Sequence, residues 1–259
     1  MKHLLKLLDC STEEIIGLLD LADQLKYEKK HNISHRHLEG KSLGMIFQKS
    51  STRTRVSFET GMYQLGGQAL FLSNRDLQIG RGEPVQDTAR VLSRYLDGIM
   101  IRTYEQKEVE DLANYGSIPV INGLTDFCHP CQVLADLMTI REKFAVLEGI
   151  KMCYIGDGNN MANSLIVGGL KTGMKVSIAT PEGYRPHAEV MAYAEGNPDF
   201  FITDDPMKAA ENADVVITDT WASMGMEAEK EVRMKAFKGY QVNDELLAAA
   251  KPGCMVLHC

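Results

Sequence analysis

The sequence lacks several features that would assign it to a specialised class of protein. No apolar run approaches the roughly 18 residues of a membrane-spanning helix, and no small-residue cleavage site follows the leucines of the N-terminal segment. Positive charge is scarce as well, because 28 Lys and Arg stand against 35 Asp and Glu, for a net charge of −7. We therefore expect a mature cytoplasmic protein with no nucleic-acid or membrane partner.

Two nucleotide-binding signatures are absent or incomplete. The chain has no G-x-x-x-x-G-K segment, which excludes a P-loop. The segment "GDGNNMA" is similar to the turn of a dinucleotide-binding unit, but Met161 stands where a further glycine is needed. The next apolar run closes on Thr180 and Pro181 instead of an acidic residue. An NAD-dependent Rossmann oxidoreductase is therefore kept only as the alternative from a different class.

The six cysteines do not indicate a disulfide framework, because most lie inside apolar segments. Cys128 and Cys131 have the C-x-x-C spacing of thiol–disulfide oxidoreductases. They lie in the middle of a long chain, however, after four predicted strands. No second pair of ligands completes a zinc site. Redox and zinc-binding functions are therefore disfavoured.

Short apolar runs alternate with longer amphipathic segments along most of the chain. The predicted strands are residues 41–47, 68–72, 97–102, 118–123, 150–158, 175–181, 200–205, 214–221 and 254–259. The helical patterns between the first strands are Arg55–Leu65, Val85–Leu96 and Glu108–Tyr115. Alternation of this kind predicts an α/β fold of two doubly wound parallel-sheet domains, residues 1–135 and 136–259. We expect the active site in the cleft between them.

Polar residues that follow predicted strands are the candidates for a binding site, because ligands of open parallel sheets bind at the carboxyl ends of strands. The segment "KSSTRTR" follows the first strand. Ser51, Thr52 and Thr54 can cap the next helix, and Arg53 brings a forked donor suited to phosphate. Two interpretations remain open here: an N-cap with solvated arginines, or a cradle for an anion.

Arg102 ends the third strand, where it is either paired with a carboxylate or directed into a cleft. His129 and Gln132 lie near the start of a long helix. A helix N-terminus lowers the pKa of a histidine, so His129 is predicted to be neutral and able to donate one hydrogen bond to a carbonyl oxygen.

The second half of the chain also carries polar residues at strand ends. Asn159 and Asn160 offer amides to a small ligand. Asp219 can bind a cationic amine or cap the helix that follows. The loop after Asp219 contains the segment "SMG", and the chain closes on His258 and Cys259.

Together these motifs resemble the aspartate and ornithine carbamoyltransferase family. The segments "STRTR" and "HPCQ" match the signature of both branches, whereas "DTWASMG" and the terminal "HC" match the ornithine branch. The resemblance covers the whole chain and agrees with the two predicted α/β domains. The family pattern continues past "HC" with "LP", so a C-terminally truncated member is expected.

The resemblance implies a role for each matching residue. Carbamoyl phosphate would be held by Ser51, Thr52, Arg53, Thr54, Gln78, Arg102, His129 and Gln132, with Gln78 reaching a neighbouring subunit. Ornithine would be held by Asn160, Asp219, Ser223 and Met224. The catalytic residues would be Arg102, His129 and Cys259, whose thiol would lie beside the reacting amine.

The implied reaction transfers the carbamoyl group of carbamoyl phosphate to the side-chain amine of L-ornithine, giving citrulline and phosphate. It serves arginine biosynthesis or runs in the reverse, catabolic direction. Putrescine, an acylated ornithine or aspartate is the alternative acceptor. The resemblance implies no metal or organic cofactor, and it implies a homotrimer or an assembly of trimers.

Overall fold

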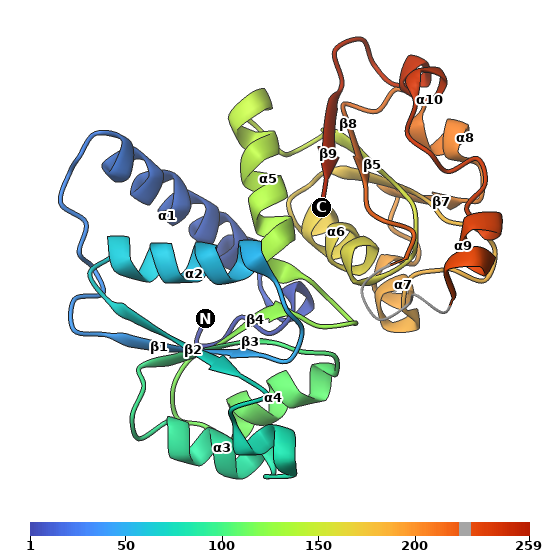
Figure 1. Ribbon diagram of the computed structural model, residues 1–259. Helices are drawn as coiled ribbons and strands as arrows, with labels where there is room; N and C mark the ends of the chain where they lie inside the picture. The colour runs from blue at the N-terminus through green and yellow to red at the C-terminus, as the bar shows by residue number, and fades with distance from the viewer. Residues whose placement is uncertain (223–228) are drawn as a thin grey trace. The chain divides into compact units, whose positions relative to one another are not determined.

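The described residues fold into two compact units. The computed structural model describes residues 1–222 and 229–259 (Figure 1). They divide into unit 1, Met1–Cys131, and unit 2, Gln132–Cys259, with the division inside helix α5 (Pro130–Phe144). No helix in these ranges is long and apolar enough to cross a lipid bilayer.

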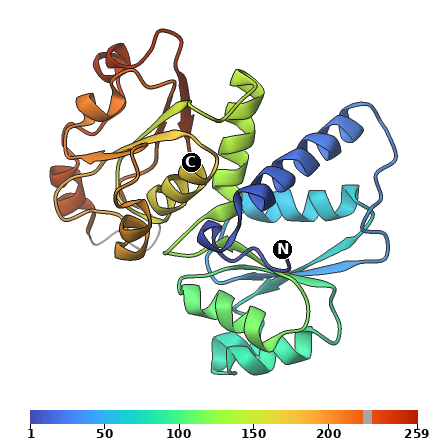
Figure 2. The same ribbon diagram turned by 180° about the vertical axis from the view of Figure 1, so that it is seen from behind.

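Unit 1, all of which is described, is a parallel sheet with helices on both faces (Figure 2). Its strand order is β2–β1–β3–β4. The strands are β1 (Ser42–Phe47), β2 (Gln68–Ser73), β3 (Gly98–Arg102) and β4 (Val120–Leu124). The helices are η1 (Leu7–Asp9), α1 (Thr12–Lys30), α2 (Thr52–Gln64), η2 (Gln78–Arg81), α3 (Val85–Leu92) and α4 (Gln106–Tyr115). In both views α1 and α2 lie on one side of the sheet, and α3 and α4 lie on the other.

The side chains of β1 show why its sequence is a continuous apolar run. Successive residues of a strand point to opposite faces. Met45 and Phe47 pack in a cluster with Met62 of α2. Ile46 packs in a second cluster with Leu112 of α4. Because both faces of the sheet are covered, β1 shows no alternation of apolar and polar residues.

Unit 2 has the same architecture. In its described part, five parallel strands have the order β7–β6–β5–β8–β9. The strands are β5 (Lys151–Ile155), β6 (Lys175–Ala179), β7 (Phe200–Thr203), β8 (Val215–Thr218) and β9 (Met255–His258). The helices are α6 (Asn160–Lys171), α7 (Ala188–Ala194), α8 (Pro206–Ala210), α9 (Lys230–Ala236) and α10 (Asp244–Ala249). A Cβ on Gly169 of α6 would lie 2.8 Å from Met152 Cε of β5, so this helix lies very close to the sheet.

The expected fold class of two parallel-sheet α/β units is confirmed. The three helices predicted between the first strands differ from the structure at four ends, two of them slightly: α2 ends at Gln64 instead of Leu65, and α4 begins at Gln106 instead of Glu108. Helix α2 begins at Thr52 instead of Arg55, because the Ser51 side chain caps it. Helix α3 ends at Leu92 instead of Leu96. The long helix α1 has no counterpart among the predicted helices.

Candidate active site

Three strands of unit 1 end side by side at one edge of the sheet. The register pairs Phe47 of β1 with Arg102 of β3, and Arg102 with Leu124 of β4. Backbone hydrogen bonds join the segments that follow, from Gln48 N to Arg102 O and from Thr103 N to Leu124 O, both at 2.9 Å. The candidate residues after these strands therefore extend from neighbouring points, as expected for a parallel sheet.

The first turn of α2 carries the hydroxyl-rich segment. Ser51 Oγ accepts a hydrogen bond from Thr54 N at 3.2 Å and donates one to Thr54 Oγ1 at 3.1 Å. The N-cap interpretation of Ser51 is therefore confirmed. The first backbone bond of the helix runs from Arg55 N to Ser51 O. The N–H groups of Thr52 and Arg53 precede it and leave the positive end of the helix dipole open to an anion.

The two arginines of this segment have different surroundings. Arg55 Nε donates to Glu59 at 3.0 Å, and the Arg55 guanidinium lies 3.8 Å from the centroid of the Phe71 ring. The Arg55 guanidinium is thus already in contact with a carboxylate and an aromatic ring. The Arg53 side chain is exposed on the first turn. Arg53 is therefore the better candidate for an anion ligand.

Arg102 and His129 are buried at the carboxyl edge of the unit 1 sheet, with 8% and 9% of their surface exposed. Burial, together with the positive charge of Arg102, lowers the pKa of His129 to about 3. The imidazole is therefore neutral at physiological pH, as predicted. The causes are burial first and the charge of Arg102 second, neither of which the sequence prediction named. A neutral imidazole beside a guanidinium can donate one hydrogen bond to a carbonyl oxygen.

Lys49 is a cationic residue of this edge that the sequence does not single out. Its ammonium group forms an ion pair with Asp126 and lies 4.4 Å from the centroid of the Tyr104 ring. The Lys49 side chain is only 10% exposed. Its one signal in the sequence is its position directly before the hydroxyl-rich segment. The sequence did not indicate these contacts, because Tyr104 and Asp126 lie far from Lys49 along the chain.

The C-x-x-C segment is unsuited to thiol–disulfide exchange. Burial raises the pKa of Cys128 and of Cys131 to about 12, which suppresses the reactive thiolate. Cys131 Sγ donates to Asn122 O at 3.4 Å, and Cys128 Sγ donates to Leu5 O at 3.5 Å. The redox hypothesis therefore has no support from the structure.

Gln132 lies on the first turns of α5, and its amide is oriented by a buried carboxyl group. Gln132 Nε2 donates to Asp136 Oδ1 at 3.0 Å, one helical turn away. Burial raises the pKa of Asp136 to about 6, although the hydrogen bond from Gln132 acts to lower it. With Nε2 engaged, Gln132 presents its Oε1 atom as an acceptor. Asp136 is a second residue that the sequence does not single out as part of a site.

Gln78 is the first residue of η2, and its side chain is exposed. Its backbone carbonyl accepts a hydrogen bond from Glu83 N at 3.0 Å. Gln78 is thus a surface residue of unit 1, and its role toward a neighbouring subunit stays a prediction.

Asp219 is the centre of a polar cluster at the carboxyl edge of the unit 2 sheet. Its carboxylate accepts hydrogen bonds from Thr220 N at 2.7 Å and from Asn159 Nδ2 at 3.3 Å. Burial raises the pKa of Asp219, although these bonds and the charge of His258 act in the opposite direction. A cationic ligand at this carboxylate would offset the cost of burying its charge.

Asn159 caps α6, whose first residue is the half-buried Asn160. Asn159 Oδ1 accepts hydrogen bonds from Met161 N at 2.9 Å and from Ala162 N at 3.4 Å. The side chain therefore occupies the helix N-terminus where a dinucleotide would place its pyrophosphate. This geometry disfavours the Rossmann alternative. The Asn159 side chain is engaged within unit 2, and the role of Asn160 toward a ligand stays a prediction.

Cys259 follows β9, the strand next to β8. Thr218 pairs with His258, and Cys259 N donates to Thr218 O at 3.3 Å. The structure thus brings Cys259 to the same sheet edge as Asp219. The predicted ligands Ser223 and Met224 lie outside the described residues.

Arg233 joins several elements of unit 2 and is absent from the sequence-based candidates. Its guanidinium donates to Asp157 at 2.7 Å, to Glu229 at 3.0 Å and to Trp221 O at 3.0 Å. The side chains of Arg233 and Asp157 are 9% and 10% exposed. Arg233 of α9 is therefore joined to the loop after β5 by a buried ion pair and to the segment after β8 by a hydrogen bond.

The fully buried Tyr154 lies near the same cluster. The nearby acidic groups of Asp219, Asp157 and Cys259 add to the effect of burial in raising the pKa of its phenol. In the described part of the chain, no group of three or more His, Cys, Asp or Glu side chains is arranged to hold a metal ion.

Two family profiles cover nearly the whole chain. Residues 2–142 match the "Aspartate/ornithine carbamoyltransferase, carbamoyl-P binding domain", and residues 148–259 match the "Aspartate/ornithine carbamoyltransferase, Asp/Orn binding domain".

Individual proteins are similar over the full length of the chain. The ornithine carbamoyltransferase of Pyrococcus abyssi is 56% identical over 263 residues, which cover 100% of this chain and 83% of that protein. The solved ornithine carbamoyltransferase of Pyrococcus furiosus is 55% identical with a TM-score of 0.95, covering 100% of this chain and 84% of the other. The solved anabolic ornithine carbamoyltransferase of Campylobacter jejuni is 43% identical with a TM-score of 0.94, covering 100% and 86%. The chain belongs to the aspartate/ornithine carbamoyltransferase family.

Proposed function

We propose that this enzyme transfers the carbamoyl group of carbamoyl phosphate to the side-chain amine of L-ornithine. The amine nitrogen forms a bond to the carbamoyl carbon, the bond from that carbon to the phosphate oxygen breaks, and the amine loses a proton. The products are L-citrulline and phosphate, and the reaction serves arginine biosynthesis. The observation that carries the proposal is the sheet edge of unit 1, where a capped helix N-terminus adjoins a buried Arg102 and a neutral His129.

The phosphate group of the substrate is assigned to the first turn of α2. Ser51, Thr52, Arg53 and Thr54 supply N–H, hydroxyl and guanidinium donors, and the helix dipole favours a dianion there. The buried Arg102 adds a permanent positive charge that stabilises the leaving phosphate. Gln78 is assigned to the phosphate of a neighbouring subunit.

The carbamoyl group needs donors for its oxygen and an acceptor for its amide. His129 and Arg102 are the donors, and Thr54 adds a hydroxyl. Gln132 accepts from the carbamoyl amide through Oε1, because its Nε2 atom is engaged by Asp136. Donors fixed before the reaction stabilise the negative charge that develops on the carbonyl oxygen. Arg102 and His129 are in this way catalytic residues.

The amino-acid end of ornithine is assigned to Asn160, Asp219, Ser223 and Met224. A buried carboxylate suits the α-ammonium group of ornithine. A second carboxylate, as in aspartate, would be repelled by it. The first domain, residues 1–135, would thus bind carbamoyl phosphate, and the second, residues 136–259, would bind ornithine.

An acceptor panel tests the proposal. Citrulline formation is measured with ornithine, while putrescine, an acylated ornithine and aspartate are run as alternative acceptors. Ornithine is expected to be the preferred acceptor. In Asp219→Asn, the KM for ornithine is expected to rise about a hundredfold, because the charge-assisted bond to the α-ammonium group is lost. The KM for carbamoyl phosphate serves as the internal control and should change little.

Preference for another amine, or an unchanged KM for ornithine in the variant, would contradict the assignment of Asp219. Absence of product with every amine, at saturating carbamoyl phosphate, would contradict the reaction itself.

Cys259 is assigned a role in removing the proton that the side-chain amine of ornithine must lose. A lysine-like amine has a pKa near 10.4, so only about one molecule in a thousand is neutral near pH 7.4. In Cys259→Ser we expect kcat to fall about a hundredfold and the apparent pKa of its pH profile to move upward, because a hydroxyl does not titrate in this range. Cys254→Ser, at the start of the segment leading into β9, is the control. A profile of unchanged shape would remove Cys259 from proton transfer.

A homotrimer or an assembly of trimers in the cytoplasm completes the proposal. The described chain carries six free cysteines, in keeping with a reducing compartment. Sedimentation equilibrium measures the assembly, and a monomeric active enzyme would exclude the role of Gln78 across subunits.

A further inference from the structure

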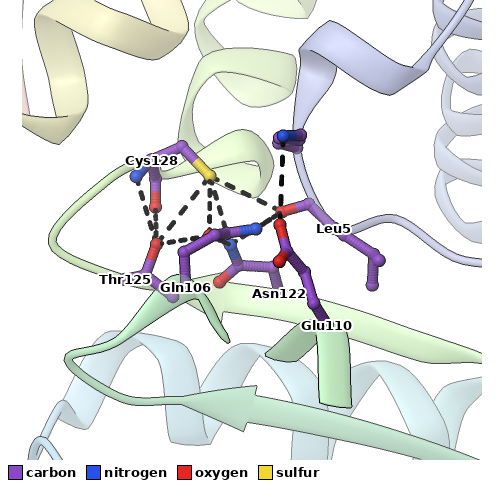
Figure 3. Close-up of polar contacts among 7 residues, drawn as sticks. Leu5, Gln106, Glu110, Asn122, Thr125 and Cys128 are labelled. Atoms are coloured by element: carbon purple, nitrogen blue, oxygen red, sulfur yellow. Dashed lines mark hydrogen bonds and ion pairs between the residues drawn. The ribbon is translucent and has the colours of Figure 1, made fainter. Parts of the chain in front are cut away.

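The backbone carbonyl of Leu5 is the meeting point of three side chains from distant parts of unit 1 (Figure 3). It accepts hydrogen bonds from Asn122 Nδ2 at 2.8 Å, from Gln106 Nε2 at 3.3 Å and from Cys128 Sγ at 3.5 Å. The donors belong to β4, α4 and the loop before α5. One oxygen atom of the N-terminal segment therefore connects three elements.

Cys128 and Gln106 close this network. Cys128 Sγ accepts from Asn122 Nδ2 at 3.2 Å and lies 3.5 Å from Gln106 Oε1. Gln106 Oε1 also accepts from Thr125 Oγ1 at 2.8 Å. We call Leu5, Gln106, Asn122, Thr125 and Cys128 the Leu5 network. Figure 3 shows the side chains of Gln106, Asn122 and Cys128 gathered at the Leu5 carbonyl, with Thr125 beside them.

The loop between β4 and α5 is fixed at both ends by the same residues. Thr125 N donates to Cys128 O at 2.9 Å, and Cys128 N donates to Thr125 Oγ1 at 3.1 Å. The next residue is His129, and Pro130 then begins α5 with a restricted φ angle. The backbone of His129 therefore has little freedom between a closed loop and a helix start.

The N-terminal segment is anchored independently at the sheet edge. Leu4 forms a parallel bridge to Ile121, with bonds from Leu4 N to Val120 O at 2.9 Å and from Asn122 N to Leu4 O at 2.8 Å. Lys6 forms an ion pair with Glu110 at 3.9 Å. The Leu5 carbonyl is thus a fixed acceptor and not part of a loose terminus.

We propose that Cys128 is a positioning residue, which holds His129 in its productive place through the Leu5 network. The inference rests on the proposed function, in which His129 donates to the carbamoyl oxygen. Cys128 contributes a small dipole that accepts from Asn122 and donates to the N-terminal segment. Its buried thiol takes no part in covalent chemistry. The N-terminal segment is on this view a support of the active site.

The first test compares three variants in the citrulline assay. In Cys128→Ala, kcat is expected to fall about tenfold, because a small displacement of a catalytic group has a large effect on rate. Cys128→Ser keeps a donor and an acceptor and should recover most of this loss. Cys10→Ala is the matched control. Cys10 is 3% exposed, as is Cys128, and its Sγ donates to Lys6 O at 3.6 Å, but it is not one of the residues of the Leu5 network.

Cys10→Ala should leave kcat within about twofold of the wild type. The Kd for inorganic phosphate should be the same in all three variants, because the first turn of α2 is outside the network. Equal losses of kcat in Cys10→Ala and Cys128→Ala would overturn the proposal, since a general loss of stability would then explain both.

A double-mutant cycle with His129→Ala is the decisive measurement. If Cys128 acts through His129, Cys128→Ala should lower kcat by less than about twofold once the imidazole is absent. A tenfold loss in that background would overturn the proposal while leaving the proposed function intact. An unchanged kcat in His129→Ala alone would instead refute the role of His129, and the proposal with it.

Discussion

Replacing Arg102 with Met is expected to lower kcat/KM for carbamoyl phosphate by about a thousandfold or more. Loss of a single fixed donor to a developing oxyanion costs about a hundred- to a thousandfold in rate. Arg102 would in addition contribute charge to the leaving phosphate. It is buried, so bulk water cannot replace it. Steady-state kinetics at saturating ornithine measure the change.

Arg102→Lys separates charge from geometry. A lysine retains the positive charge but lacks the planar fork that binds two oxygens at once. Compared with Arg102→Met, we expect Arg102→Lys to restore phosphate binding more fully than it restores kcat. Complete recovery of kcat by Lys, or a loss confined to KM in Arg102→Met, would contradict a role of Arg102 in the transition state.

The Arg102→Met variant should also change the pKa of His129, an effect that can be measured without any assay of catalysis. Arg102 is one of the two causes that lower the pKa of His129 to about 3. In Arg102→Met this pKa should rise, while burial keeps it below the ordinary histidine value. An NMR titration of the imidazole in the free enzyme measures the shift. An unmoved pKa would show that the two side chains are not neighbours.

Replacing Arg233 with Met is expected to destabilise unit 2 by about 3–5 kcal/mol, because removing one partner leaves an uncompensated buried charge. The partner is Asp157, held by a 2.7 Å bond. Urea unfolding is followed by the fluorescence of Trp221, the single tryptophan of the chain. Its ring stacks on Phe237 at a centroid distance of 6.0 Å, so it reports on unit 2.

The loss of stability in Arg233→Met should depend on pH in a defined direction. Burial raises the pKa of Asp157 even in the presence of Arg233, which acts to lower it. Without Arg233 the pKa in the folded state rises further above the unfolded value. A raised folded pKa means that stability is lost as pH rises through it. The difference between wild type and Arg233→Met should therefore be larger at pH 8 than at pH 5.

Two controls distinguish this effect from the loss of any surface charge. The ion pair of Lys208 with Asp205 is exposed, so Lys208→Met should cost less than about 1 kcal/mol. The double variant Asp157→Asn/Arg233→Met removes both buried charges and should be more stable than Arg233→Met alone. A pH-independent loss, or a double variant less stable than the single one, would refute the ion-pair explanation.

Much of the fold follows from local patterns in the sequence. The apolar runs at residues 41–47 and 97–102 correspond to β1 and β3, because strands covered on both faces need apolar side chains throughout. Ser51 and Asp219 were found because polar residues at strand ends stand out against such runs. The family motifs depend on the same short segments, so they are also visible without a structure.

The contacts of Lys49, Asp136, Arg233 and the Leu5 network were not visible in the sequence. Cys128 illustrates why: its spacing from Cys131 suggested redox chemistry, whereas its partner Leu5 lies 123 residues away. The neutral state of His129 was expected from a local cause, yet burial and the distant Arg102 produce it.

Periodicity and neighbours along the chain were enough to predict the succession of strands, the parallel α/β class and the identity of the motif residues. The folded structure was needed to show which of these residues are buried, which atoms are already engaged and which charges act on one another. Burial and electrostatic coupling depend on distance in space, and folding brings together residues that the chain keeps far apart.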